Sequence, residues 1–168
     1  MRFLISALVI GIAVSRIATA AAPDPEAAYR IKISPHLSSL AEKAELAIRQ
    51  VLLTEKKDED NVPRHYISGD IDGDGQDDLL VVTTFTNGSG NYWGCYFVLI
   101  LSSAPDRPII KQFGGKSERA YDSINMNEGG ISVDFLYYGG TDALCCPSIK
   151  KKGHFILKNS TLVEEGAR

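Results

Sequence analysis

The sequence lacks any apolar run long enough to cross a bilayer as a helix. Its N-terminal run, Phe3–Val14, has about a dozen residues, fewer than the ~20 that span a membrane. A positive start, Met1-Arg2, precedes this run, and Ala18-Thr19-Ala20 follows it with the small-x-small pattern that signal peptidases read. We therefore expect a signal peptide over residues 1–20, cleavage near Ala20, and a periplasmic or secreted protein that does not span the membrane.

The chain also lacks an excess of basic residues. Its 18 Lys and Arg face 21 Asp and Glu, and removal of residues 1–20 deletes Arg2 and Arg16 but no acid, which leaves 16 against 21, a net charge of −5. An acidic chain without a basic patch argues against nucleic-acid binding. After a short segment, 21–33, the remaining length predicts one domain over residues 34–165, and nothing in the sequence indicates an oligomeric state.

Cysteine is scarce, with three residues in the chain. An odd number in an exported protein predicts one disulfide and one free thiol. Cys95 lies within an apolar run, and we expect it to pair with Cys145 or Cys146, which would stabilise the fold by ~3–4 kcal/mol. A redox-active Cys145–Cys146 pair, as in a thiol oxidoreductase, is the alternative.

Histidine is equally scarce, which limits catalytic arrangements. The three histidines are His36, His65 and His154. His154 follows Lys150-Lys151-Lys152-Gly153, where a basic turn explains it without chemistry, and His65 is expected at the surface near the start of a strand. No residue set defines a reaction, so we expect a non-catalytic protein, with an envelope hydrolase as a lesser alternative.

One amphipathic helix is predicted near the start of the domain. Ser34 is suited to cap it and Pro35 to occupy its first position. Apolar residues then recur at steps of three and four, which predicts one face packed on a core. These residues are Leu37, Leu40, Ala41, Ala44, Ile48, Val51 and Leu52.

The rest of the domain reads as a series of strands separated by turn residues. Runs rich in β-branched and aromatic residues occur at 79–85, 92–101, 109–113, 131–138, 154–157 and 161–164. Asn87-Gly88-Ser89-Gly90-Asn91 predicts a hairpin turn between the first two runs. The predicted fold class is therefore α+β, with one N-terminal helix packed on an antiparallel meander sheet.

An acidic loop at residues 70–78 is the strongest functional signal. Asp70, Asp72, Asp74 and Asp78 occupy positions 1, 3, 5 and 9, and Gly75 stands at position 6, where a calcium loop bends sharply. Gln76 would add its backbone carbonyl. We expect a structural Ca²⁺ held by Asp70, Asp72, Asp74, Gln76 and Asp78, because a hard cation with six to eight oxygen ligands relieves the repulsion between these carboxylates.

The loop differs from an EF-hand because its twelfth position is Val81, not a glutamate, and no helix is predicted before it. It resembles the Asp-x-Asp-x-Asp-Gly-x-x-Asp loops of FG-GAP repeats in integrin-type propellers, where the metal is structural. The chain has one such loop, so the resemblance implies calcium binding but no propeller. With the segment Thr141–Ser148, the chain also looks like small exported bacterial proteins of unassigned function.

Two binding roles fit these features. The first is an exported calcium-binding domain that recognises a protein or envelope component through exposed aromatic residues, with Tyr92, Trp93, Tyr137 and Tyr138 as candidates. The alternative is a periplasmic inhibitor or immunity protein that blocks a cell-wall-degrading enzyme. A compact, acidic, disulfide-linked domain without catalytic residues suits either role.

Overall fold

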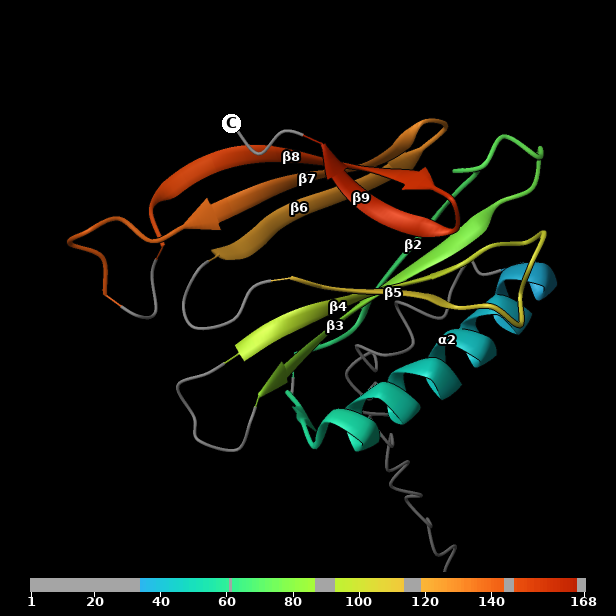
Figure 1. Ribbon diagram of the computed structural model, residues 1–168, viewed down its shortest axis with the longest axis horizontal. Coiled ribbons are helices and arrows are strands. Elements are labelled where there is room, and N and C mark those ends of the chain that lie inside the picture. The colour runs from blue at the N-terminus through green and yellow to red at the C-terminus, as the bar shows by residue number, and fades with distance from the viewer. Residues whose placement is uncertain (1–33, 61, 87–92, 114–118, 144–146, 166–168) are drawn as a thin grey trace, which may run out of the picture. The chain divides into compact units, whose positions relative to one another are not determined.

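A computed structural model describes residues 34–60, 62–86, 93–113, 119–143 and 147–165 (Figure 1). The chain separates into two compact units, residues 1–32 and 33–168, and all described residues belong to the second. The predicted signal peptide (1–20) and N-terminal segment (21–33) lie outside the described residues.

The helix α2 (Pro35–Glu55) begins where the sequence predicts. The hydroxyl of Ser34 accepts a hydrogen bond from the Leu37 N–H at 3.3 Å, and Pro35 takes the first position. After the helix ends, Lys56 adopts a left-handed conformation with φ 51°. Its backbone N–H donates to the carbonyl oxygens of Leu52 and Leu53. One face is buried, formed by Leu37, Leu40, Ala44, Ala47, Ile48 and Leu52.

The first antiparallel sheet comprises β1 (Asp58–Glu59), β2 (His65–Gly69), β3 (Asp78–Thr86), β4 (Trp93–Ile100) and β5 (Ile109–Phe113). β3 pairs with β1 and β2 along one side and with β4 along the other, and β5 pairs with β4. Alternate side chains leave β3 on opposite faces: Leu79 and Val81 pack with α2, while Leu80 and Val82 enter a second core. The sheet is thus apolar on both faces.

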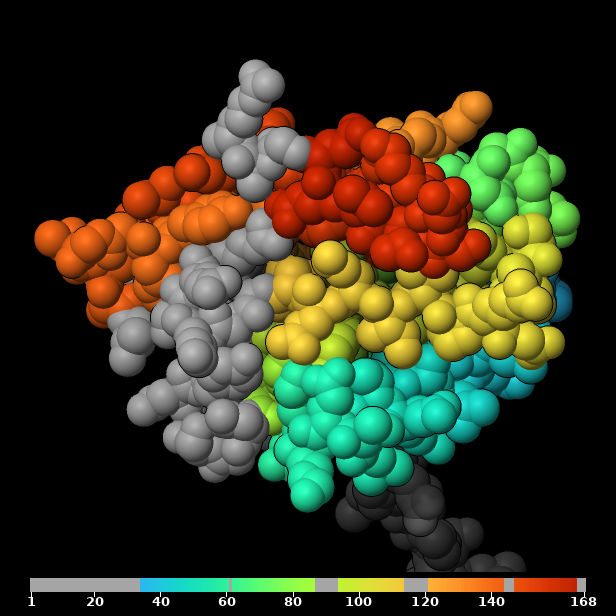
Figure 2. Space-filling view, in the orientation of Figure 1, coloured from blue at the N-terminus to red at the C-terminus, as the bar shows by residue number. Residues whose placement is uncertain are grey.

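That second core lies against another antiparallel sheet, formed by β6 (Arg119–Asn127), β7 (Gly130–Tyr137), β8 (Ile149–Lys158) and β9 (Thr161–Glu165) in chain order. Phe97 of the first sheet packs against Phe155 of the second, with ring centroids 5.3 Å apart, and Phe113 against Phe135 at 5.6 Å. Figure 2 shows β9, β5 and α2 as successive red, yellow and cyan layers.

The predicted α+β fold, a helix on one meander sheet, is wrong. Apart from one helix, the described residues form nine strands in two antiparallel sheets, so the protein is mainly β. The reason is visible in β3, where every residue from Asp78 to Thr83 is buried. A strand that is apolar on both faces requires a cover on each side, and one helix covers only one. The second sheet supplies the other cover.

Candidate metal centre

The acidic loop connects β2 to β3, whose pairing begins at Gly69 and Asp78. Gly73 (φ 77°) and Gly75 (φ 84°) take the left-handed conformations that let the backbone curl. The Asp70 carboxylate holds this curl, since its Oδ1 accepts from the Gly73 N–H at 2.7 Å and its Oδ2 from the Gly75 N–H at 2.9 Å. The first acid of the motif thus shapes the loop from within.

Asp78 is the floor of the site and is fully buried. Its Oδ2 accepts from the Ile71 N–H at 2.9 Å, and its Oδ1 accepts from the Ser102 N–H at 2.7 Å. Burial raises the pKa of Asp78, the hydrogen bonds from Ser102 and Ile71 oppose this, and the charge of Asp72 adds to the rise. A cation nearby would favour the charged form of this carboxylate.

Three carboxylates converge at this point. Each of Asp70, Asp72 and Asp78 offers an oxygen, and these oxygens all lie within 4.8 Å of one another. Oxygens that share one Ca²⁺ at 2.3–2.6 Å stand at most about 5 Å apart, so the spacing fits a single cation. The cluster could therefore hold a metal ion.

One of the five predicted ligands, Asp74, is engaged differently. Asp74 lies outside the cluster of three; its Oδ1 accepts from the Gln76 N–H at 2.8 Å and its Oδ2 from the Ser102 hydroxyl at 3.0 Å. Gln76 is exposed. The structure therefore brings together Asp70, Asp72 and Asp78, and Asp74 joins the loop to Ser102, two residues after the end of β4.

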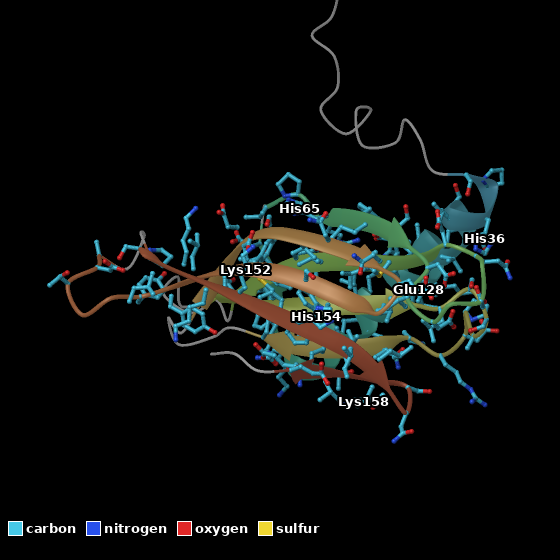
Figure 3. All side chains as sticks on the ribbon, turned by 90° about the horizontal axis from the view of Figure 1, so that it is seen from above. His36, His65, Glu128, Lys152, His154 and Lys158 are labelled. Carbon is cyan, nitrogen blue, oxygen red and sulfur yellow. The ribbon has the colours of Figure 1, made fainter. Side chains whose placement is uncertain are left out.

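Four residues beside the loop were not predicted as part of the site. Two of them are serines: Ser102 donates to Asp78 and Asp74, as described above, and the Ser103 hydroxyl donates to Asp72 at 2.9 Å. An ideal Cβ at Gly73 would stand 4.0 Å from the Glu128 Oε1, and His36 Nε2 lies 3.2 Å from the Asp77 carbonyl oxygen. Figure 3 places His36 and Glu128 at the same end of the molecule. Of these four residues, only the two serines could have been found from the sequence. The predicted hairpin places the residues that follow its second strand beside those that precede its first strand, and Leu79 indeed pairs with Ile100.

Cys95 is buried in the core between the sheets, and this burial raises the pKa of its thiol to about 11. Cys145 and Cys146 lie outside the described residues, so the disulfide from Cys95 stays a prediction. The turn near them is held by Asp142, whose carboxylate accepts from the Gly139 N–H at 2.6 Å and the Ser148 N–H at 2.8 Å.

The predicted aromatic contacts are described only in part. Tyr92 and the side chain of Trp93 lie outside the described residues. Tyr137 and Tyr138 are half-buried; the Tyr137 ring packs against Phe135 with centroids 6.2 Å apart, and Lys151 Nζ lies 5.3 Å from its centroid. Tyr137 thus contributes to packing around the second sheet.

Comparisons of the chain with protein-family models, curated proteins and solved structures find no match. Within the described residues, α2 is too polar to cross a membrane.

Proposed function

We propose that this protein is an exported calcium-binding domain that acts by binding a protein or envelope component rather than by catalysis. The observation that carries the metal assignment is the convergence of Asp70, Asp72 and Asp78 on one point, with a fully buried carboxylate as its floor. The export assignment depends on the sequence of residues 1–20, and the binding role on the lack of a residue set that defines a reaction.

Calcium is the metal that suits these donors best. All three side chains offer carboxylate oxygens, which hard cations prefer, whereas zinc and copper sites usually contain histidine or cysteine. The irregular, glycine-containing loop favours Ca²⁺ over Mg²⁺, because Mg²⁺ demands near-ideal octahedral geometry. The resemblance to FG-GAP loops supports the same choice. The ion would neutralise the acids and hold the β2–β3 connection rigid.

A thermal unfolding experiment tests the metal assignment. A ligand that binds only the folded state stabilises it by RT ln(1 + [L]/Kd), ~2.7 kcal/mol at a hundredfold excess, which is roughly 8–10 °C for a domain of this size. We expect calcium to raise the Tm of the wild type relative to chelator. The variant Asp70→Asn/Asp72→Asn should lose this shift, because each change removes a charged ligand.

Asp77→Asn is the matched control, since Asp77 is an exposed acid of the same loop outside the cluster of three. It should keep the full calcium shift. Identical melting curves in chelator and in millimolar calcium would refute a calcium site, and a larger shift with Mg²⁺ than with Ca²⁺ would reassign the metal.

The binding role needs a separate test. Purified protein, with calcium present, should show no turnover of cell-wall glycan, peptide or ester substrates. Reproducible turnover that is lost on mutation of a described residue would replace the binding role with an enzymatic one. It would leave the calcium result untouched, so the two parts of the proposal fail independently.

A further inference from the structure

The acidic loop lies against the second sheet as well as the first. An ideal Cβ at Gly69, where β2 ends, would stand 2.8 Å from the carbonyl oxygen of Met126 on β6, so the two backbones meet with no room for a side chain. The β6–β7 turn follows at once, between the paired residues Asn127 and Gly130. A hairpin of the second sheet therefore borders the candidate metal centre.

Ile71 inserts from the loop into the core between the sheets. Its side chain is 5% exposed and belongs to the same buried cluster as Met126 and Ile131, which pair with each other beside the β6–β7 turn. The Ile71 N–H donates to Asp78 Oδ2 at 2.9 Å. The buried carboxylate of the candidate metal centre thus holds the residue through which the loop enters the core that it shares with the hairpin.

Glu128 brings a negative charge from the β6–β7 turn to the loop. An ideal Cβ at Gly73 would stand 4.0 Å from the Glu128 Oε1, and the Gly73 N–H donates to Asp70 Oδ1 at 2.7 Å. With ~2.5 Å between an ideal Cβ and its own nitrogen, these oxygens of Glu128 and Asp70 are at most about 9 Å apart. Glu128 is exposed, and no ion pair among the described residues neutralises it.

A cation at the centre would act on the hairpin in two ways. Held by Asp70, Asp72 and Asp78, it would reduce the negative charge that repels Glu128, across a distance that salt at physiological concentration screens only in part. It would also restrain Asp78, and with it the packing of Ile71 in the shared core. Without the cation, both effects are lost together.

We propose that calcium at this centre couples the two sheets, because it fixes the β6–β7 hairpin together with the acidic loop. This coupling rests on the proposed calcium site, whose influence it extends to the second sheet. Removal of calcium loosens the end of that sheet nearest the loop and leaves unchanged its far end, where Tyr137 pairs with Ile149. The coupling is reciprocal, so Glu128 in turn strengthens calcium binding.

Hydrogen exchange followed by mass spectrometry tests the coupling. An opening that must release the ion becomes rarer by a factor of 1 + [L]/Kd, about 100 at a hundredfold excess of calcium over Kd. We expect residues 124–131, like residues 70–78, to exchange at least ~10-fold more slowly in calcium than in chelator. Residues 149–152, at the far end of β8, should exchange at the same rate in both.

Glu128→Gln isolates the charge contact. The change keeps the size of an exposed side chain, so the variant should fold normally. At low salt we expect it to bind calcium about two- to fivefold more weakly than the wild type in a calorimetric titration, and to narrow the calcium-dependent difference in exchange at 124–131. In ~1 M KCl, where the screening length is ~3 Å, its calcium affinity should match that of the wild type.

Asp122→Asn is the matched control. Asp122 is an exposed acid of the same strand as Met126, and it pairs with Lys150 of β8 at 3.0 Å. Its loss should change neither the calcium affinity nor the exchange at 124–131. Calcium protection confined to 70–78, or an unchanged affinity of Glu128→Gln at low salt, would overturn the coupling and leave the calcium site standing. A wild type without any calcium response would refute the site itself, and the coupling with it.

Discussion

The two sheets of this protein share one core but differ on their other faces. The first sheet is covered by α2, so β3 and β4 are buried on both sides. Among the described residues, the second sheet is covered on its inner side only, and its other face carries a row of polar residues. The first sheet therefore lies between two packed layers and holds the acidic loop at one end, while the second sheet exposes polar side chains to solvent.

The charges of the two sheets differ in the same way. Around the first sheet, Arg64 bonds Glu45 and Glu59, its side chain is only 17% exposed, and the hydrogen bond with Glu59 is the first cause of its raised pKa. The Glu45 carboxylate also accepts from the Tyr66 hydroxyl at 2.7 Å. On the second sheet, ion pairs such as Lys152–Asp134 stand in solvent. The Arg64 cluster is thus partly shielded from water, whereas solvent screens the Lys152–Asp134 pair.

The largest effect should come from the contact between the sheets. Phe97 is fully buried and packs against Phe113, with centroids 4.4 Å apart, and against Phe155. Phe97→Ala should lower the free energy of unfolding by ~3–5 kcal/mol, because it opens a cavity in the shared core. Urea denaturation measures this loss. Leu53→Ala, at a position 80% exposed on α2, should change stability little. A loss below about 1 kcal/mol for Phe97→Ala would mean that the sheets do not share this core.

A smaller effect is expected where the loop joins the scaffold. Asp78→Asn leaves one carbonyl acceptor for two N–H donors, the buried one of Ile71 and the part-buried one of Ser102. We expect a loss of ~1–3 kcal/mol in chelator, and a further relative loss in calcium because a charged ligand is gone. Asp77→Asn should show neither change. If Asp78→Asn retains the wild-type response to calcium, the buried acid is not a ligand.

The smallest effect should appear in the acid range. Hydrogen bonds from Arg64 lower the pKa of Glu59, although burial opposes this. Burial alone would raise the pKa of Glu45, but hydrogen bonds from Arg64 and Tyr66 outweigh burial, so this pKa is also lowered. Because the pKa values of both carboxyl groups are lowered in the fold, these groups stabilise it at pH values above their ordinary pKa of 4.5. This stabilisation is lost as the pH falls through the folded pKa values. Glu59→Gln should therefore flatten the loss of stability below that pH, measured by urea denaturation.

Asp78 works in the opposite direction, which gives a control for sign. Its pKa is raised by burial, so its contribution to stability increases as pH falls from the folded pKa toward the ordinary value of 3.8. In chelator, Asp78→Asn should remove that contribution and steepen the acid loss that Glu59→Gln flattens. Parallel pH profiles for the two variants would contradict the assigned causes.

Local patterns predicted much of the scaffold. The start of α2 at Ser34-Pro35 and the pairing of the runs that became β3 and β4 are confirmed. β1, β2 and β6 were missed because short or polar strands carry little hydrophobic signal; β2 and β6 include His65, Ser123 and Asn125. The lysine-rich start of β8 was assigned to a turn, although Lys150 and Lys152 alternate outward on a strand.

The sequence by itself determined the helix, the acidic loop and the apolar strands, since each follows from residues close together in the chain. Only the tertiary structure decided that the strands divide into two sheets, because that depends on which apolar faces meet. It likewise decided that Asp70, Asp72 and Asp78 converge while Asp74 bonds Ser102, and that Ser132, His154 and Glu165 form one row. Strand register brings together residues that no spacing along the chain relates.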